Sequence, residues 1–531
     1  MSVEAFAQFL VDASRNSFAD KTKLKKVYQD MHRPLSEYYI ASSHNSSLLG
    51  NQLTSRSSSE AIKRALLLGV RMIELDAWEG EDGEPIVTHG HTLVVPTTFE
   101  ACIAVVREVA FFKTKYPLIL TIENHCGLEQ QRRQAVILHE QLGSMLYGYD
   151  RDFATTPLHQ LMEGEHAWKS PEELIGRIII RDKPINLDED AMKAAADAGA
   201  GAGSGAADAS SPSPSSPSHF PFHGKGAKAK EACSDDDDDE DDDEEDPSGA
   251  YGADTALLAL MYIKNVKLRY KISPFGVDFH EPGFCSSSSI DERKLATLTK
   301  YPERSLSLAS YCCRHIIRVY PAGQRFDSSN FDPLPAWSAG VQCVALNVQK
   351  NSPAVWISHG KFRDNGGAGY VLKPPALRSE DASVEFSEPL TLKVDVLSGH
   401  YLMPAFDFRD ASRDPLQIPT EVCVETSVHG VKADTINFRT RPVKRNCFNP
   451  SWNQAAQFKV TRPDLAHFLM VVKDQDGQVF YQASLALHCV REGYRVVPLS
   501  TPSLAPSKYA FLFCKFTILP MEDAQSSPEE I

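Results

Sequence analysis

Short apolar segments alternate with helix-like segments from about residue 36 to residue 186 of this 531-residue chain, and the alternation resumes at about residue 255. Strands that alternate with helices in this way form a mainly parallel sheet with crossover helices. The strand-like segments number about eight, which is what a closed (β/α)8 barrel needs. The pattern therefore predicts an α/β fold in which the two stretches together form one TIM-like barrel.

Residues 190–250, which separate the two stretches, have a composition that cannot form a hydrophobic core. They pass from Ala and Gly through Ser and Pro to an unbroken acidic run at 235–246. Segments of this kind stay disordered because they bury too little apolar surface. The acidic run supplies 12 negative charges, so the formal net charge of −15 would be −3 without it. We expect a disordered acidic linker that splits the barrel.

The last block of the chain has short, evenly spaced strand-like segments without clear helices, which is typical of an antiparallel β-sandwich. The first residues are helix-like instead, and a second helix is expected over residues 21–31. The predicted parts are a helical segment at 1–33, a first barrel half at 34–189, a linker at 190–250, a second barrel half at 251–380 and a C-terminal sandwich at 388–520.

The cysteines and the apolar segments limit the cellular setting. The 11 cysteines include no CxxC pair, which indicates buried thiols in a reducing compartment. No apolar stretch reaches the roughly 18 residues of a transmembrane helix, and the first residues lack a signal-peptide pattern. We therefore expect a cytoplasmic monomer that is peripheral on the inner face of the plasma membrane or on another cytosol-facing membrane. No nucleic-acid partner is expected.

Polar residues stand at the ends of several apolar segments. The carboxyl ends of parallel strands open on one face of a barrel, and barrel enzymes carry their active sites on that face. We therefore expect these residues to meet in one site. They are His44, Asn45, Glu74, Asp76, His89 and Glu123.

Glu74 and Asp76 suggest a metal ion. Because they are two residues apart on a predicted strand, they share one face at a separation of about 7 Å. Facing carboxylates are costly unless a hard cation lies between them. Together with Asn45 and Glu123 they form an all-oxygen set, and calcium takes about 6–8 oxygen ligands. Zinc, which favours nitrogen and sulfur, fits less well.

Other interpretations of these residues remain open from the sequence alone. Glu74 could pair with Arg71 or Arg64, and a histidine at a strand end is often only a hydrogen-bonded core residue. His91 lies two residues beyond His89, so a two-histidine metal site is also conceivable.

Long segments of the chain resemble the eukaryotic phosphoinositide-specific phospholipase C family. Its X region is matched by PLSEYYIASSHNSSL, VRMIELDAWEG, PIVTHGHTL and YPLILTIENHCGLEQQ, and its Y region by RVYPAGQRFDSSNFDPLPAWSAGVQCVALNVQ and DNGGAGYVLKP. The last block resembles the family's C2-type sandwich, and residues 1–33 resemble the tail of its EF-hand lobe. Neither an EF-hand calcium loop nor a pleckstrin-homology domain is recognisable.

The resemblance implies calcium-dependent hydrolysis of phosphatidylinositol 4,5-bisphosphate in anionic membranes, as part of intracellular lipid signalling. The products would be diacylglycerol and inositol trisphosphate, formed through a cyclic phosphodiester. The family pattern implies catalytic roles for His44, His89 and Glu74. It implies calcium binding by Asn45, Glu74, Asp76 and Glu123. It implies substrate binding by Arg181, Lys183, Ser289, Arg318 and Tyr320. A second calcium site in the C2-type domain would use Asp414, Asp474 and Asp476.

The chain departs from the family pattern at two positions. Arg181 stands where the family usually carries a lysine, which keeps the charge but changes the hydrogen-bonding geometry. Gln324 stands where several relatives carry a membrane-inserting tryptophan, while Leu53 and Leu93 keep apolar character at the rim. We therefore do not expect strong insertion of the barrel rim into a membrane.

Two other function classes fit the sequence less well. A lipid-binding scaffold without activity would have lost a catalytic histidine, whereas both are present. A barrel phosphodiesterase of another kind, such as a glycerophosphodiesterase, would lack the basic set at 181, 183 and 318 and the C-terminal sandwich.

Overall fold

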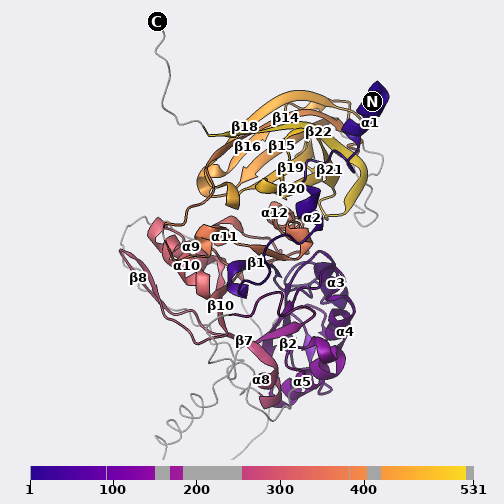
Figure 1. Cartoon of the computed structure of the whole chain (residues 1–531). Coiled ribbons are helices and arrows are strands. Elements are labelled where there is room, and N and C mark those ends of the chain that lie inside the picture. Colours follow the sequence, from indigo (N-terminus) through magenta and orange to yellow (C-terminus); the bar gives the residue numbers. More distant parts are fainter. Residues whose placement is uncertain are drawn as a thin grey trace, which may run out of the picture. The chain divides into compact units, whose positions relative to one another are not determined.

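The structure, a computed structural model, describes residues 2–90, 92–149, 168–182, 254–381, 383–403 and 420–521. The predicted linker at 190–250 lies outside these ranges, and so do His91, Lys183 and Asp414. Figure 1 shows the described elements with their labels.

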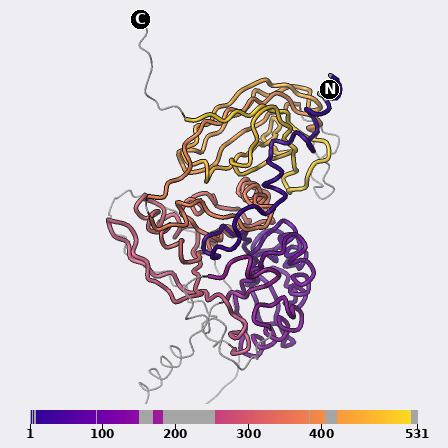
Figure 2. Tube along the Cα trace, in the orientation of Figure 1, coloured from indigo at the N-terminus to yellow at the C-terminus, as the bar shows by residue number. Residues whose placement is uncertain are grey.

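Eight parallel strands form a closed barrel, as the alternation of strands and helices predicted. The strands are β1 (Tyr38–Ser43), β2 (Met72–Trp78), β5 (Leu118–His125), β6 (Ile178–Asp182), β7 (Met261–Asn265), β10 (Ser286–Asp291), β11 (Ile316–Tyr320) and β12 (Cys343–Leu346). Their order is β1-β12-β11-β10-β7-β6-β5-β2, and β2 closes the barrel by pairing with β1 at Ser42 and Met72. The traces of the two halves lie side by side in Figure 2 because β6 of the first half pairs with β7 of the second.

Amphipathic helices cover the barrel strands. α4 buries Phe99, Cys102, Ile103 and Val106, whose three- and four-residue spacing places them on one face. Side-chain caps fix several helix starts, for example Thr98, whose Oγ1 accepts from the N–H of Ala101. The helices of this region are α3 (Ser59–Leu67), α4 (Phe99–Val109), α5 (Leu128–Leu142), α8 (Thr255–Leu260), α9 (Glu292–Leu298), α10 (Pro302–Arg314), α11 (Leu334–Ser338) and α12 (Pro353–Phe362).

Two features of the barrel differ from the sequence pattern. The segment PIVTHG forms only the two-residue strand β3 (Ile86–Val87), which pairs antiparallel with β2 outside the ring, so His89 does not follow a barrel strand. Conversely, β10 is a barrel strand that the sequence pattern does not indicate. Four of its six residues are serines, so the segment lacks the apolar residues by which the other strands are recognised. Short antiparallel strands also flank the ring, namely β4 (Thr97–Thr98) beside β3 and β13 (Tyr370–Leu372) beside β1.

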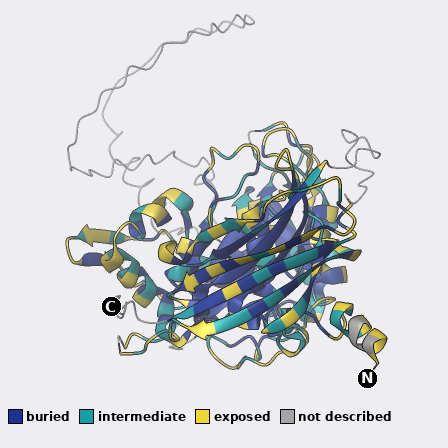
Figure 3. Ribbon diagram, turned by 90° about the horizontal axis from the view of Figure 1, so that it is seen from above, coloured by how far each residue is buried: buried dark blue, intermediate teal, exposed yellow. Residues whose placement is uncertain are grey.

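The C-terminal block is an antiparallel β-structure, as predicted. Buried and exposed residues alternate along its strands, and this alternation is visible in Figure 3. The strands are β14 (Leu390–His400), β15 (Glu421–His429), β16 (Ile436–Arg439), β17 (Val443–Lys444), β18 (Ser451–Val460), β19 (His467–Asp474), β20 (Val479–Ala486), β21 (Gly493–Ser500) and β22 (Pro506–Pro520). The sheet order is β16-β15-β19-β20-β21-β22-β14-β18.

The N-terminal segment packs on this sandwich. It contains α1 (Val3–Val11) and α2 (Lys21–Lys25), and Phe18 between them stacks on Phe516 in the sandwich core. α2 ends far earlier than the predicted 21–31. The backbone N–H groups of Tyr28 and Gln29 donate to Asn365 Oδ1, both at 3.0 Å, so contacts with the barrel replace the helical hydrogen bonds there.

A hydrogen-bonded junction joins the N-terminal segment, the barrel and the sandwich. The carboxylate of Asp364, which is fully buried, accepts from Tyr28 Oη at 3.1 Å and from Gln29 Nε2 at 3.3 Å. It also accepts from His488 Nε2 at 2.9 Å and from Cys489 Sγ at 3.4 Å. We call Asp364, His488 and Cys489 the junction cluster.

Short elements complete the described chain. The hairpin β8 (Tyr270–Ser273) and β9 (Gly276–Phe279) forms a separate sheet. The 3₁₀ turns are η1 (Leu35–Glu37), η2 (Gly143–Met145), η4 (Asn365–Gly367), η5 (Pro375–Leu377), η6 (Lys432–Asp434), η7 (Pro463–Leu465) and η8 (Leu487–Cys489). The cysteines in the described ranges do not form disulfides with one another. A helix with the length and apolarity to cross a bilayer does not occur in those ranges.

Candidate active site

Three acidic side chains meet on the barrel face where the strands end. Glu74 and Asp76 lie on β2, and Asp76 is in register with Glu123 on β5. One carboxylate oxygen from each of the three lies within 4.8 Å of the others. We call Glu74, Asp76 and Glu123 the carboxylate cluster.

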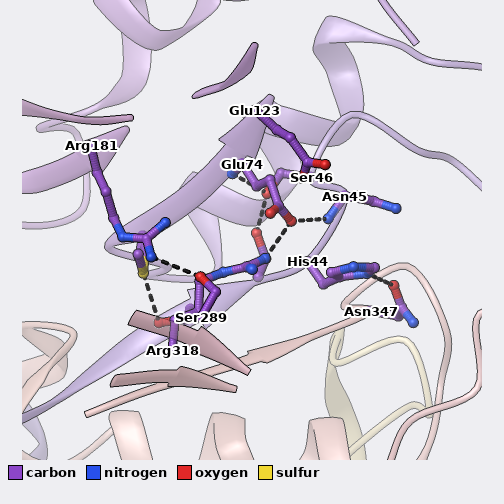
Figure 4. Close-up of polar contacts among 12 residues, drawn as sticks. His44, Asn45, Ser46, Glu74, Glu123, Arg181, Ser289, Arg318 and Asn347 are labelled. Carbon is purple, nitrogen blue, oxygen red and sulfur yellow. Dashed lines mark hydrogen bonds and ion pairs between the residues drawn. The ribbon is translucent and has the colours of Figure 1, made fainter. Parts of the chain in front are cut away.

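Glu74 is held by two partners from distant parts of the chain. Arg318 Nη2 on β11 lies 2.5 Å from Glu74 Oε2, and both side chains are buried. The backbone N–H of Asn45 donates to the same oxygen at 3.0 Å. Figure 4 shows Glu74 between these two residues. Glu74 thus pairs with Arg318 and not with Arg71, whose guanidinium donates to backbone carbonyls, or with Arg64.

In the carboxylate cluster, the negative charge of Asp76 is not balanced. Its Oδ1 atom is buried and has no hydrogen-bond partner. Burial, together with the charges of Glu123 and Glu74, raises the pKa of Asp76 well above its ordinary value. A divalent cation bound by the three carboxylates would remove this conflict. The donors are all oxygens, so the site fits calcium or magnesium better than zinc.

Asn45 adds an amide oxygen to this set. It follows β1 with a positive φ of 42°, a conformation that asparagine tolerates better than most residues. Its Nδ2 donates to Gln52 Oε1 at 2.8 Å, so Oδ1 is the end of the amide that is available to a cation.

His44 lies at the carboxyl end of β1, beside the cluster. Its Nδ1 donates to Asn347 Oδ1 at 3.1 Å, and its ring stacks on Tyr320 with 6.0 Å between ring centroids. Burial lowers the pKa of His44, although the charge of Glu74 opposes the effect. A neutral imidazole with hydrogen on Nδ1 leaves Nε2 as the reactive nitrogen.

His89 reaches the site from the segment after β3. Its Nδ1 donates to the backbone carbonyl of Gln52 at 2.9 Å. The same segment is attached to the β1–α3 loop by a hydrogen bond from the N–H of Leu93 to the carbonyl of Leu53. The structure thus brings His89 to the face predicted for it, but by loop contacts and not by a barrel strand.

Arg181 and Arg318 provide the positive charge of the site. Arg181 is 1% exposed and donates to Ser287 Oγ, Asn265 Oδ1 and Ser289 Oγ, each at 2.7 Å. Burial lowers the pKa of Arg181 to about 10, so it stays protonated at neutral pH.

Arg318 pairs in register with Ser289 and lies 5.2 Å from the centre of the Tyr320 ring. Its buried Nε has no hydrogen-bond partner and remains available to an anion. Four of the five predicted substrate-binding residues are therefore neighbours, joined by these contacts. Lys183, the fifth, lies outside the described residues.

Several polar residues of the site were not predicted from the sequence. Asn265 and Asn347 follow the apolar segments of β7 and β12, so the strand-end criterion that selected His44 could have found them. Ser287 lies in a polar strand that was not recognised. Gln52 lies in a loop and carried no signal in the sequence.

The predicted second calcium site, in the C2-type domain, differs from the carboxylate cluster in how its carboxylate is hydrogen-bonded. Asp474 Oδ1 accepts from the N–H groups of Asp476 at 2.9 Å and Gln478 at 2.7 Å, so it caps its own turn. Within the described ranges, the two groups of three side chains able to hold a metal are the carboxylate cluster and the junction cluster. A C2-type site with Asp414 stays a prediction.

Comparisons with known proteins agree on one family. The X domain model of phosphatidylinositol-specific phospholipase C matches residues 31–184, the Y domain model matches 259–376, and the C2 domain model matches 390–489. The L. pealei PLC21 crystal structure is similar, with a TM-score of 0.73 and 28% identity, over 99% of this chain and 60% of that chain.

Two curated relatives extend the comparison. The 1-phosphatidylinositol 4,5-bisphosphate phosphodiesterase delta-1 of Rattus norvegicus is 33% identical over 98% of this chain and 64% of its own length. The zeta-1 enzyme of the same name from Mus musculus is 31% identical over 97% of this chain and 78% of its own length. The chain thus spans a little under two thirds of the delta-type relatives that it matches.

Proposed function

Because the chain belongs to the phosphatidylinositol-specific phospholipase C family, we propose that it hydrolyses phosphatidylinositol 4,5-bisphosphate to diacylglycerol and inositol trisphosphate. The observation that carries the proposal is the meeting of the carboxylate cluster, two histidines and two arginines on one face of the barrel. A phosphodiester needs such groups, because charge develops on its oxygens as the bond breaks.

The proposed cofactor is calcium, held by the carboxylate cluster and Asn45. The support is the all-oxygen donor set and the unpartnered Oδ1 of Asp76. Bound there, the ion would act as a Lewis acid on the phosphate and on the attacking hydroxyl.

The proposed reaction begins within the substrate. The inositol 2-hydroxyl adjoins the phosphodiester, so its attack is intramolecular and gives a cyclic phosphodiester with little loss of entropy. Glu74 takes the proton of this hydroxyl. His44, in the form protonated on both ring nitrogens, donates a hydrogen bond from Nε2 to the phosphate as negative charge builds up. His89 protonates the departing diacylglycerol oxygen and then activates the water that opens the ring.

The arginines are proposed to select a phosphorylated ring. Arg181 and Ser289 lie on one side of Arg318 and His44 lies on the other (Figure 4). The Tyr320 ring lies against Arg318 and stacks on His44. Unphosphorylated phosphatidylinositol offers these cations no ring phosphate to bind. The bisphosphate should therefore be preferred.

The proposed location is the surface of an anionic, cytosol-facing membrane. Three apolar side chains are exposed on neighbouring loops at this face, with Leu93 81%, Phe326 53% and Leu53 40% exposed. Backbone hydrogen bonds join these loops, from Leu93 to Leu53 and from Gln52 to Phe326. Phe326 lies two residues after Gln324, so an aromatic side chain remains at a rim where the usual tryptophan is replaced.

We also propose the domain division expected from the sequence. It consists of an EF-hand-like remnant at 1–33, the X half at 34–189, the linker at 190–250, the Y half at 251–380 and the C2-type sandwich at 388–520.

The direct test is hydrolysis of vesicles that contain either phosphatidylinositol 4,5-bisphosphate or phosphatidylinositol, with free calcium or with a chelator. We expect inositol trisphosphate to be released only with calcium, and faster turnover of the bisphosphate. His44→Ala should lower turnover by roughly 100-fold or more, which also controls for contaminating lipase activity. Binding of the vesicles without turnover would instead support a lipid-binding scaffold.

A further inference from the structure

Gln52 lies in the loop between β1 and α3 and is 5% exposed. Its backbone and its side chain both bind residues of the site. Its backbone carbonyl accepts from His89 Nδ1 at 2.9 Å, and its Oε1 accepts from Asn45 Nδ2 at 2.8 Å. Its Nε2 donates to Ser328 Oγ at 2.7 Å and to Asn347 Oδ1 at 3.2 Å.

Asn347 extends these contacts to the second histidine. The oxygen that accepts from Gln52 Nε2 also accepts from His44 Nδ1, at 3.1 Å. Gln52 is therefore bonded directly to His89 and Asn45, and through one shared oxygen to His44. Both histidines and one proposed calcium ligand are therefore linked to Gln52 by hydrogen bonds.

The chemistry of each contact allows one arrangement of hydrogens. A backbone carbonyl can only accept, so His89 must carry its hydrogen on Nδ1. Asn347 Oδ1 likewise only accepts, which places the hydrogen of neutral His44 on Nδ1. Gln52 Oε1 only accepts, so Asn45 must present its NH2 group there and keep its oxygen for the cation.

We propose that Gln52 is a positioning residue that fixes the reactive nitrogen of both histidines and the orientation of the Asn45 amide. The inference rests on the proposed function and deepens it, because it explains why Nε2 of each histidine and Oδ1 of Asn45 are the atoms available for the reaction. Partners of this kind, which orient a ligand without touching the metal, typically change metal affinity by about 10- to 100-fold when they are lost.

The side chain and the backbone of Gln52 have separable effects. Gln52→Met keeps the length of the side chain and the backbone carbonyl, but removes the contacts to Asn45 and Asn347. Calcium affinity should therefore fall by about 10-fold or more, whereas His89 keeps its hydrogen-bond partner. Gln349→Met is the matched control. Gln349 Nε2 also contacts Asn347 Oδ1 and Ser328 Oγ, both at 3.4 Å, but does not contact Asn45.

Two measurements on the purified full chain test the proposal. The first is calorimetric titration with calcium in the absence of lipid, alongside unfolding in urea. We expect a weaker calcium affinity only in Gln52→Met, with an unfolding free energy close to that of Gln349→Met. Unchanged affinity in Gln52→Met, or an equal loss in Gln349→Met, would overturn the calcium part of the proposal.

The second measurement is the ¹⁵N chemical shifts of the histidine rings in the calcium-free protein, which report which nitrogen carries hydrogen. We expect the Nδ1–H form for neutral His44 and His89, retained by His89 in Gln52→Met. An Nε2–H form of either histidine in the unsubstituted protein overturns the proposal. This measurement needs neither turnover nor calcium. The proposed hydrogen positions can therefore fail or hold independently of the proposed enzyme activity, which the vesicle assay tests.

Discussion

The described part of the chain contains two groups of potential metal ligands, and they differ in how their carboxylates are satisfied. In the junction cluster, the buried carboxylate of Asp364 accepts from a phenol, an amide, an imidazole and a thiol. In the carboxylate cluster, Asp76 faces two other acids, and its buried Oδ1 accepts from no group.

The pKa shifts of the two aspartates have opposite directions because their neighbours differ in charge. Burial alone would raise both values. The pKa of Asp364 is nevertheless lowered, because the hydrogen bond and charge of His488 outweigh burial. The pKa of Asp76 is raised, because Glu123 and Glu74 add to the effect of burial. The difference indicates that the junction cluster stabilises the fold, whereas the carboxylate cluster costs stability that a bound cation would restore.

The largest expected difference between the two regions is in turnover. His89→Ala removes a proposed acid and base, and should lower turnover of the bisphosphate by about 10²- to 10⁴-fold. His488→Ala removes one hydrogen bond of the junction cluster, far from the chemistry, and should change turnover by less than about threefold. The turnover of both variants is measured on vesicles, at a temperature well below that of unfolding. A similar loss in the two variants would remove the distinction between the regions.

The next difference is in the free energy of unfolding. Asp364→Asn places an amide among groups that all donate hydrogen bonds, and should destabilise the protein by about 3 kcal/mol. Asp76→Asn removes an unpartnered charge and should stabilise the calcium-free protein by about 1 kcal/mol. Urea unfolding in the presence of a chelator measures both. Destabilisation by Asp76→Asn would show that this aspartate has a structural role.

The pH dependence should separate the two aspartates further. An unfolded aspartate titrates at about pH 3.9. Because the pKa of Asp364 is lowered on folding, its contribution is complete above about pH 4 and is lost as the pH falls through the lower folded value. Because the pKa of Asp76 is raised, the penalty for its ionisation appears as the pH rises above about 4.

The measurement is the unfolding free energy of each Asn variant relative to the unsubstituted protein, in chelator, from pH 3 to pH 7. The destabilisation by Asp364→Asn should shrink toward pH 3, and the stabilisation by Asp76→Asn should grow toward pH 7. As the pH rises, the unfolding free energy relative to the unsubstituted protein should therefore fall for Asp364→Asn and rise for Asp76→Asn. A change of the same sign in both variants would contradict the opposite pKa shifts.

The smallest expected effect is that of the junction thiol. Cys489 Sγ lies 3.4 Å from Asp364 Oδ1, and a thiol is a weak donor. Cys489→Ser should therefore change the unfolding free energy by no more than about 1 kcal/mol. Zinc should have little effect on the unfolding midpoint of either protein. A zinc-dependent rise that Cys489→Ser abolishes would show that the junction cluster binds metal after all.

The barrel could be predicted because its strands are apolar and its helices amphipathic. β10 could not, because its serines face a buried arginine: Ser287 and Ser289 bind Arg181, and hydrogen bonds replace apolar burial there. A strand of this kind gives no hydrophobic signal.

The carboxylates of the site could be predicted from their spacing along one strand, but their partners could not. Arg318 meets Glu74 only because closure of the barrel brings β11 opposite β2. Gln52 and His89 meet through loops, whose paths no periodicity reveals. The strand-end criterion therefore finds residues that strands position and misses those that loops position.

Calorimetric calcium titration of the lipid-free protein, compared with Asp76→Asn and Asp364→Asn, tests whether the carboxylate cluster is the metal centre. We expect a calcium site that Asp76→Asn abolishes and that Asp364→Asn keeps at nearly the same affinity. Calcium binding that survives Asp76→Asn unchanged, or that is lost in a folded Asp364→Asn protein, would contradict the assignment of the carboxylate cluster as the metal centre.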